Sequence, residues 1–272
     1  MSVLRTFKAL PTMMRIGISE AVAYRAEMLV WVLSTTMPFV MLVMWSAVAQ
    51  NAPVVSASGR GYSAGTFTAY FLAVFIVRQL IASWASWEIN FEVRQGTLAM
   101  RLLRPIHPII SYAVGNLAAM PMRMVVTLPV VVVIILVGAG GSFPSDWKVW
   151  VLWVFAMIGG WMITFFANVA IGSLSLYIES SIKVMDIWLT SFFVFSGYLF
   201  PLDLFPDWLR AISGWLPFRF MIGVPVEVMT GAHGFDEAVM LVARQWGWAA
   251  ALALGAVLLW NNGVRRFQAF GG

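Results

Sequence analysis

Long apolar stretches separated by short polar ones dominate the sequence. A helix needs about 20 apolar residues to cross the hydrocarbon layer of a bilayer. The stretches that approach or exceed this length cover residues 26–48, 66–87, 108–137, 147–177, 184–200 and 244–260. The pattern predicts an all-α polytopic membrane protein with about six transmembrane helices. No soluble domain stands out, so residues 1–272 are predicted to form a single transmembrane domain.

Three other segments are too polar or too interrupted to cross the membrane plainly. Residues 1–25 carry Lys8 and Arg15 on one side of a helical projection and Phe7 and Met14 on another, which predicts an amphipathic helix in the plane of the membrane interface. A solvated leader is the alternative. Residues 88–107 are the most charged segment, and residues 201–243 are amphipathic and broken by prolines.

Composition supports the membrane assignment. Apolar residues make up 61% of the chain and charged residues only 11%, whereas soluble domains carry about 25% charged residues. The net charge of +5 comes from basic residues at the ends of apolar stretches, without the basic stripe that nucleic-acid binding would need.

The distribution of these basic residues predicts the orientation. They are more numerous on the side that carries both termini and residues 88–107, which is therefore predicted to be the cytoplasmic side of the cell membrane. The other side would receive Arg60, Lys148, Arg210, Arg219 and Arg244.

Motifs for catalysis or metal binding are absent from the sequence. No phosphate-binding G-x-x-x-x-G-K-[ST] loop occurs, cysteine is absent, and the two histidines, His107 and His233, are far apart. We therefore expect no enzyme activity, cofactor or metal site in this chain. If ATP drives it, another protein must hydrolyse the ATP.

Within the charged segment, the sequence predicts a short helix on the cytoplasmic side. Gly96 and Thr97 offer a helix start, with Thr97 as the cap, and Pro105 ends the segment. Leu98, Leu102 and Leu103 would form a small apolar face. Such a face needs a cover, which either the bilayer surface or a groove on a partner would provide.

This segment resembles a known family. The pattern E-x-x-x-G-T-L from Glu92, followed by L-L-x-P from Leu102, resembles the coupling segment of the ABC-2 exporter permeases, which lies between their second and third spans. A second match, at Gly197, Pro201, Pro206, Trp208 and Pro217, resembles the family's fifth helix and the extracellular re-entrant hairpin after it. The tail at residues 265–271 resembles a branch in which two different permeases often share one ATPase.

The resemblance implies an exporter of drugs, polysaccharides or lipids that works by alternating access. A cytoplasmic ATPase dimer, carrying ATP and magnesium, would dock on the coupling segment, and a second permease chain, identical or different, would complete the path. The residues implied for coupling are Glu92, Arg94, Gly96, Thr97, Leu98, Arg101, Leu102, Leu103, Arg104 and Pro105.

Three polar residues within apolar stretches are candidates for a translocation path. Arg78 and Arg123 are costly in a bilayer, so they should face a cavity, snorkel to the headgroups or pair with an acid such as Glu88. Asn168 continues a face of small residues that begins at Gly159, and helix packing is favoured over a path there.

Two other classes of function remain open. A secondary transporter or channel driven by an ion gradient would need acids within the membrane, and the apolar stretches offer almost none. An intramembrane enzyme would need convergent His, Asp or Ser side chains, which the sequence does not show. Near the hairpin, Trp208, Trp215, Phe218 and Arg219 are predicted to anchor the chain at the interface.

Overall fold

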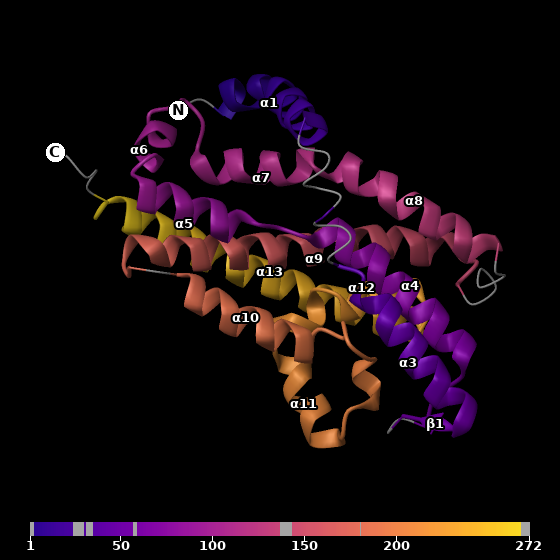
Figure 1. Ribbon diagram of the computed structural model, residues 1–272. Helices are drawn as coiled ribbons and strands as arrows, with labels where there is room; N and C mark the ends of the chain where they lie inside the picture. Colours follow the sequence, from indigo (N-terminus) through magenta and orange to yellow (C-terminus); the bar gives the residue numbers. More distant parts are fainter. Residues whose placement is uncertain are drawn as a thin grey trace.

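The computed structural model describes residues 3–23, 30, 35–56, 59–136, 143–179 and 181–267. It is built almost entirely from helices (Figure 1). They are α1 (Val3–Ala23), α3 (Met37–Asn51), α4 (Ala64–Ile81), α5 (Ala85–Gln95), α6 (Leu98–Leu102), α7 (Pro108–Ala118), α8 (Met120–Leu136), α9 (Trp147–Ser173), α10 (Ile182–Phe195), α11 (Asp207–Trp215), α12 (Gly223–Met229) and α13 (Phe235–Val264). A two-residue antiparallel pair, β1 (Val54–Val55) and β2 (Gly61–Tyr62), joins α3 to α4, and short 3-10 helices η2 (Leu174–Leu176), η3 (Leu202–Leu204) and η4 (Pro217–Phe220) occur in the second half.

Helices α9 and α13 form the central pair of the bundle, and α4, α5 and α12 pack against α9. Figure 1 shows α6 and the end of α13 at one end of the bundle, while β1 lies toward the other. An N-terminal helix is present, as predicted, but α1 begins at Val3 and contains Pro11 in its interior, whereas proline is favoured in a first turn; α1 packs along α7. Its place at a membrane interface stays a prediction.

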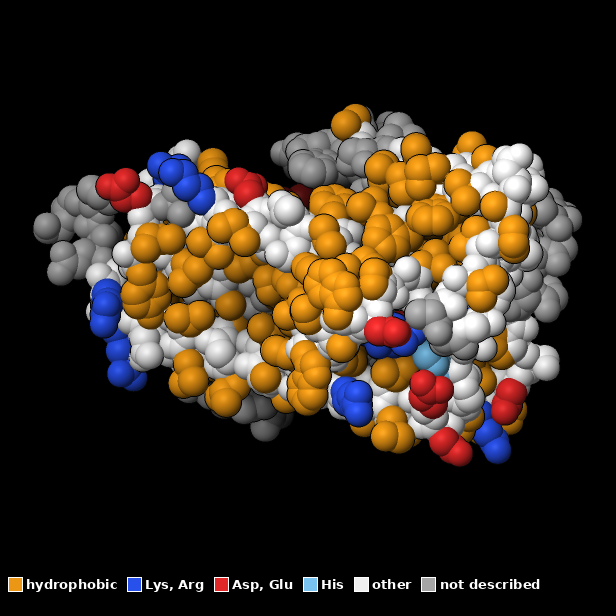
Figure 2. Space-filling view, turned by 90° about the horizontal axis from the view of Figure 1, so that it is seen from below, with side chains coloured by type: hydrophobic (Ala, Val, Ile, Leu, Met, Phe, Trp, Pro, Cys, Tyr) orange, Lys and Arg blue, Asp and Glu red, His pale blue; other side chains and the backbone are white. Residues whose placement is uncertain are grey.

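The structure supports a multi-pass membrane protein. Among the described residues, three helical stretches are long and apolar enough to cross a bilayer: Ala64–Gln95, Trp147–Leu176 and Phe235–Val264. The pair Pro108–Val125 and Thr127–Val133, bent by 41°, adds a fourth if it counts as one span. Figure 2 shows charged side chains gathered mainly toward the two ends of one face, with apolar side chains between them. That distribution suits a molecule surrounded by lipid.

The described helices within the predicted first and fifth spans are short. Helix α3 has 15 residues and α10 has 14, below the length of about 20 that a plain span needs. Pro38, predicted inside the first span, lies instead in the first turn of α3, where a missing N–H costs nothing. Residues 26–29 and 31–34 of that predicted span lie outside the described residues.

One predicted boundary is corrected. The last helix begins at Phe235 rather than Arg244. Asp236 and Glu237 occupy its first turn, where negative charge is favourable, although hydropathy assigns them to a loop. The helix of the predicted third span bends between Val125 and Thr127, one turn before Pro129. Proline has no N–H to donate to the preceding turn, and its ring crowds that turn, which accounts for the bend.

The face of small residues on α9 is a packing face, as predicted. A Cβ added at Gly160 would lie 2.8 Å from the Met221 carbonyl oxygen, and one at Gly159 would lie 2.8 Å from Gln245 Oε1. Fully buried Gln245 donates from Nε2 to the carbonyls of Ala156 (2.9 Å) and Phe220 (2.7 Å). One side chain of α13 thereby ties α9 to η4.

Candidate functional site

The predicted coupling segment forms a turn between two helices at one end of the bundle (Figure 1). Glu92 and Arg94 lie on α5, and the chain reverses at Gly96, whose φ of 72° is readily adopted only by glycine. Helix α6 then contributes a single turn and ends at Leu102. Thr97 precedes α6 at the N-cap position, but its side chain does not cap the helix as predicted; its hydroxyl donates instead to the Glu92 carbonyl at 3.5 Å.

Arg101 fixes α6 to both neighbouring helices. Its Nε donates to the two carboxylate oxygens of Glu92 at 2.9 and 2.8 Å, and Nη2 donates to Glu88 Oε1 at 2.8 Å and also contacts Glu92. From α7, the Tyr112 hydroxyl donates to Glu92 at 2.6 Å, and Ser111 accepts from Arg101 at 3.0 Å. Bidentate arginine–carboxylate pairs combine two charge-assisted hydrogen bonds in one plane. This Arg101 cluster therefore makes α5, α6 and the start of α7 one rigid unit.

The apolar face predicted for the segment is divided. Leu98 is fully buried and packs in a cluster with Ile89 and Trp260. Leu103, in contrast, has 82% of its surface exposed. The outward surface of the turn includes Arg94, Thr97, Met100, Leu103, Arg104 and Pro105, which combine positive charge with apolar area.

The long stretch Ala64–Gln95 is interrupted between α4 and α5. Residues 82–84 are not helical, so the last carbonyls of α4 and the first N–H groups of α5 lose their intrahelical partners. Inside a bilayer such groups must be satisfied by protein. Side chains from α7, α8 and α9 supply these partners.

Arg123 of α8 binds the carbonyl groups at the end of α4. Its Nη1 donates to the carbonyls of Gln79 (3.2 Å) and Ala82 (2.9 Å), and its guanidinium lies 4.6 Å from the Trp84 ring centre. Asn116 of α7 accepts from the Trp84 N–H at 3.2 Å.

Asn168 of α9 binds Ser86 at the start of α5. Its Oδ1 accepts from the Ser86 hydroxyl at 2.8 Å and from the Ser86 N–H at 3.4 Å, while its Nδ2 donates to the Thr164 carbonyl. Arg78, the third candidate for a path, lies 5.3 Å from the ring centre of Phe192. Arg123 and Asn168 therefore contact backbone, which agrees with a packing role, and their part in a path stays a prediction.

The predicted hairpin follows α10. Gly197 turns the chain with a φ of 82°, and its carbonyl accepts from the Tyr70 hydroxyl at 2.7 Å. Pro201 and Pro206 precede η3 and α11, and Pro217 begins η4. Trp208 is exposed, like Trp215, as an anchor should be.

The anchor prediction is wrong for the other two residues. Phe218 is only 8% exposed, and Arg219 is bound in an ion pair. That ion pair belongs to a charged cavity, which the sequence did not reveal.

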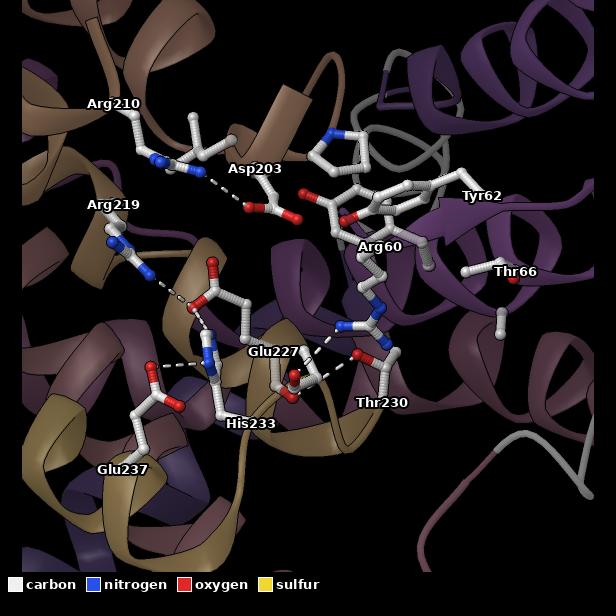
Figure 3. A pocket seen from close by; sticks show the side chains of 15 residues that line it. Arg60, Tyr62, Thr66, Asp203, Arg210, Arg219, Glu227, Thr230, His233 and Glu237 are labelled. Atoms are coloured by element: carbon white, nitrogen blue, oxygen red, sulfur yellow. Dashed lines mark hydrogen bonds and ion pairs between the residues drawn. The ribbon is translucent and has the colours of Figure 1, made fainter. Parts of the chain in front are cut away.

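The cavity has a volume of about 530 Å³ and lies between the start of α4, the hairpin and the start of α13 (Figure 3). Its charged and titratable lining residues are Arg60, Tyr62, Tyr70, Asp203, Arg210, Arg219, Glu227, His233 and Glu237. Three of the five basic residues assigned to the non-cytoplasmic side thus meet at one place, through contacts between segments distant in sequence. In the sequence, the only indication of this cavity was the group of charged residues near Pro201 and Pro225.

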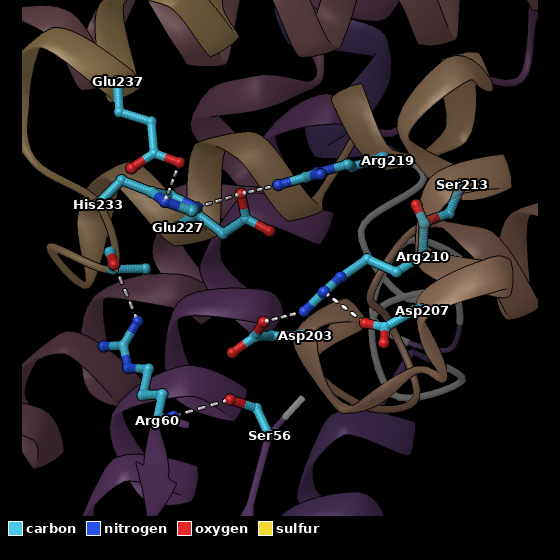
Figure 4. Close-up of polar contacts among 11 residues, drawn as sticks. Ser56, Arg60, Asp203, Asp207, Arg210, Ser213, Arg219, Glu227, His233 and Glu237 are labelled. Atoms are coloured by element: carbon cyan, nitrogen blue, oxygen red, sulfur yellow. Dashed lines mark hydrogen bonds and ion pairs between the residues drawn. The ribbon is translucent and has the colours of Figure 1, made fainter. Parts of the chain in front are cut away.

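Ion pairs cross this cavity (Figure 4). Glu227 Oε2 accepts from Arg219 Nη2 at 2.9 Å and lies 3.1 Å from His233 Nε2. His233 Nδ1 lies 3.0 Å from Glu237 Oε1. Arg210 pairs with Asp203 at 3.3 Å and with exposed Asp207.

These contacts shift the titration of the central pair. Burial alone would raise the pKa of the Glu227 carboxyl, but Arg219 and His233 outweigh burial and lower that pKa to about 2. The hydrogen bond to Glu227 raises the pKa of His233, against the opposing effect of burial. Both ring nitrogens face carboxylate oxygens, an arrangement that only the imidazolium satisfies with two N–H donors.

Comparison with known proteins identifies the fold and its role. The sequence profile described as ABC-2 family transporter protein matches residues 35–271. The chain belongs to the ABC-2 transporter family. No curated protein matches the sequence.

Membership of the ABC-2 family defines the chain as a membrane permease of an ABC transporter, and such permeases associate with an ABC ATPase. It also agrees with the apolar helices of a multi-pass membrane protein. Among the described residues, no group of three or more His, Cys, Asp or Glu side chains could hold a metal ion. The cavity itself is lined by ion pairs and hydrogen-bond donors.

Proposed function

We propose that this chain is the permease of an ATP-driven exporter whose ATPase dimer docks on the turn between α5 and α7. The observation that supports the proposal is the Arg101 cluster, which binds α6 rigidly to both neighbouring helices. Such a turn can transmit the motion of the ATPase to the helices only if the turn itself does not deform. The exposed Leu103 and Arg104 would provide the contact surface.

In this mechanism the chain itself is not an enzyme. ATP and magnesium would be bound by the partner ATPase, and ATP would drive transport by favouring one of two permease conformations. Six crossings would place both termini and α6 in the cytoplasm, with the hairpin outside. A second permease chain, identical or a paralogue, would form the other half of the path.

The substrate class follows from the family resemblance. It would be amphipathic, lipid-like, drug-like or a glycan, and it would move outward by alternating access. The described residues within the candidate spans carry their acids near the ends, at Glu88, Glu92, Asp236 and Glu237. An ion-coupled secondary transporter would use acids deeper in the membrane.

The test is purification of the tagged full chain from its native membrane in mild detergent. We expect a soluble ATPase to be retained in stoichiometric amount. Leu103→Asp and Arg104→Glu should each reduce retention about tenfold or more, because an unpartnered charge at a docking surface costs a few kcal/mol. Arg265→Glu is the matched control, since Arg265 is also exposed and follows the end of α13.

Each outcome separates the candidate functions. Loss of the ATPase from the α6 variants, with retention in Arg265→Glu, supports the proposal. If the chain is isolated alone and reconstituted vesicles transport on a proton or sodium gradient without ATP, the exporter mechanism is wrong and the secondary transporter replaces it.

A further inference from the structure

The cavity lined by the hairpin contains one arginine whose charge no carboxylate neutralises. Arg210 and Arg219 each pair with an acid, and His233 pairs with two. Arg60 makes no ion pair within the described parts of the chain. Its Nη1 donates only to the Ala232 carbonyl, at 3.1 Å.

A second hydrogen-bond donor lies beside it. Tyr62 is only 7% exposed, it lines the cavity, and its hydroxyl makes no hydrogen bond to any described residue. Burial and nearby Asp203 raise the pKa of Tyr62 to about 12, so its hydroxyl keeps its proton at neutral pH. The guanidinium of Arg60 lies 5.9 Å from the centre of the Tyr62 ring.

The two walls of the cavity differ in what they offer a ligand. Figure 3 shows Arg60, Tyr62 and Thr66 along one wall, with Glu227, His233 and Glu237 on the other. The acids of the second wall are occupied by their own partners, and Asp203, the cavity acid near Tyr62, pairs with Arg210 at 3.3 Å. The first wall therefore presents an uncompensated positive charge and a free hydroxyl donor, which together suit an oxyanion.

We propose that this cavity binds a phosphate group through Arg60 and Tyr62. A volume of about 530 Å³ exceeds what a bare phosphate needs and lies within the range of small-molecule sites, about 300–1,000 Å³. A lipid headgroup or a free phosphate ester would therefore fit equally well. The site lies on the opposite side of the α4–α5 break from α6 along the chain, and its binding does not depend on the ATPase partnership proposed above.

The test uses the purified full chain in lipid nanodiscs, without any ATPase. Thermal unfolding is followed while inorganic phosphate is added, with chloride at equal ionic strength as the reference for screening. In a second arm, native mass spectrometry measures how much phosphatidylglycerol the protein retains against diacylglycerol, which lacks the phosphate. We expect a phosphate-dependent rise in melting temperature, selective retention of phosphatidylglycerol, or both.

The variants decide whether Arg60 and Tyr62 are responsible. Arg60→Gln should weaken binding about tenfold or more and Tyr62→Phe about threefold, the usual range for a charged and a neutral hydrogen bond. Arg60→Lys keeps the charge and should retain most of the affinity, which separates lost binding from lost folding. Arg244→Gln, at an exposed arginine outside the cavity, should bind like the original chain.

A response to phosphate alone identifies a free phosphate ester as the ligand, and retention of phosphatidylglycerol alone identifies a lipid headgroup. Either result, abolished in Arg60→Gln, supports the site. Equal binding by Arg60→Gln and Arg244→Gln would overturn it, as would no response to either probe.

Discussion

Replacing Arg123 by methionine tests whether this side chain holds the α4–α5 break together. Arg123 is 4% exposed and donates to the carbonyls of Gln79 and Ala82. Methionine is an unbranched, flexible and shorter apolar side chain, and it donates no hydrogen bond. The buried Gln79 carbonyl and the partly buried Ala82 carbonyl would then lose these donors.

The expected loss can be worked out from these two contacts. A buried acceptor left without a partner costs about 1–3 kcal/mol, so two give about 2–6 kcal/mol. Part of this is returned because the variant no longer buries a charge. We expect a net loss of about 1–4 kcal/mol in the free energy of unfolding. Ordinary hydrogen bonds between membrane helices average about 0.6 kcal/mol, so two of those would give only about 1.2 kcal/mol.

The assay is equilibrium unfolding in mixed micelles with increasing sodium dodecyl sulfate, followed by tryptophan fluorescence. Arg244→Met is the control, because it makes the same replacement at an exposed position. Arg123→Lys should fall between the two, since a single ammonium cannot reproduce the guanidinium geometry. If Arg123→Met loses no more than Arg244→Met, the carbonyls of Gln79 and Ala82 have other partners and the reasoning fails.

Three further predictions concern single positions. Gly197→Ala should lower the melting temperature, because residue 197 has a φ of 82° and a Cβ there would lie 2.7 Å from the Tyr70 hydroxyl. Gly214→Ala, where a Cβ meets nothing within 4 Å, should melt like the original chain. An equal fall in melting temperature for both variants would contradict this prediction. Gly172→Ala should cost about 1–3 kcal/mol in the same micelle titration, because the new carbon would lie 2.9 Å from Ile89 Cβ, and an unchanged unfolding curve would refute that crowding. The raised pKa of His233, which faces Glu227, Glu237 and the Arg219 pair, stabilises the fold fully below the ordinary imidazole value of about 6.5, and this contribution is lost as the pH rises through the raised pKa. As the pH rises through this range, the melting temperature should therefore fall in the original chain and fall less in His233→Gln. If the melting temperatures of the two proteins change with pH in parallel, His233 is not the cause.

Local patterns in the sequence were sufficient for several parts of the fold. The small face of α9 was predictable because Gly159 and Gly160 lie next to each other in an apolar stretch, where only close packing makes use of them. The turn at Gly96 is also local, since it rests on a glycine with positive φ. Composition and hydropathy were enough for the membrane class.

Features that depend on distant contacts could not be predicted in the same way. The α4–α5 break contains neither proline nor glycine, and its backbone is satisfied by Arg123, Asn116 and Asn168 from three other helices. The charged cavity likewise joins Arg60 to residues more than a hundred positions away. Hydropathy placed the start of α13 too late because Asp236 and Glu237 look like loop residues, although a helix N-terminus favours them.

The α4–α5 break and the bend in α8 limit how a displacement of α6 is transmitted to the rest of the bundle. The Arg101 cluster makes α5, α6 and the start of α7 one unit, and this unit is bounded by non-helical residues 82–84 on one side and by the bend between Val125 and Thr127 on the other. Regular helices resist bending, so relative motion concentrates where intrahelical hydrogen bonds are missing. Arg123 contacts the first interruption and lies within one helical turn of the second. Any rotation of α5 against α4 must therefore either carry the Arg123 contacts with it or break them, which makes this arginine the position where stability and the transmission of motion are most directly linked.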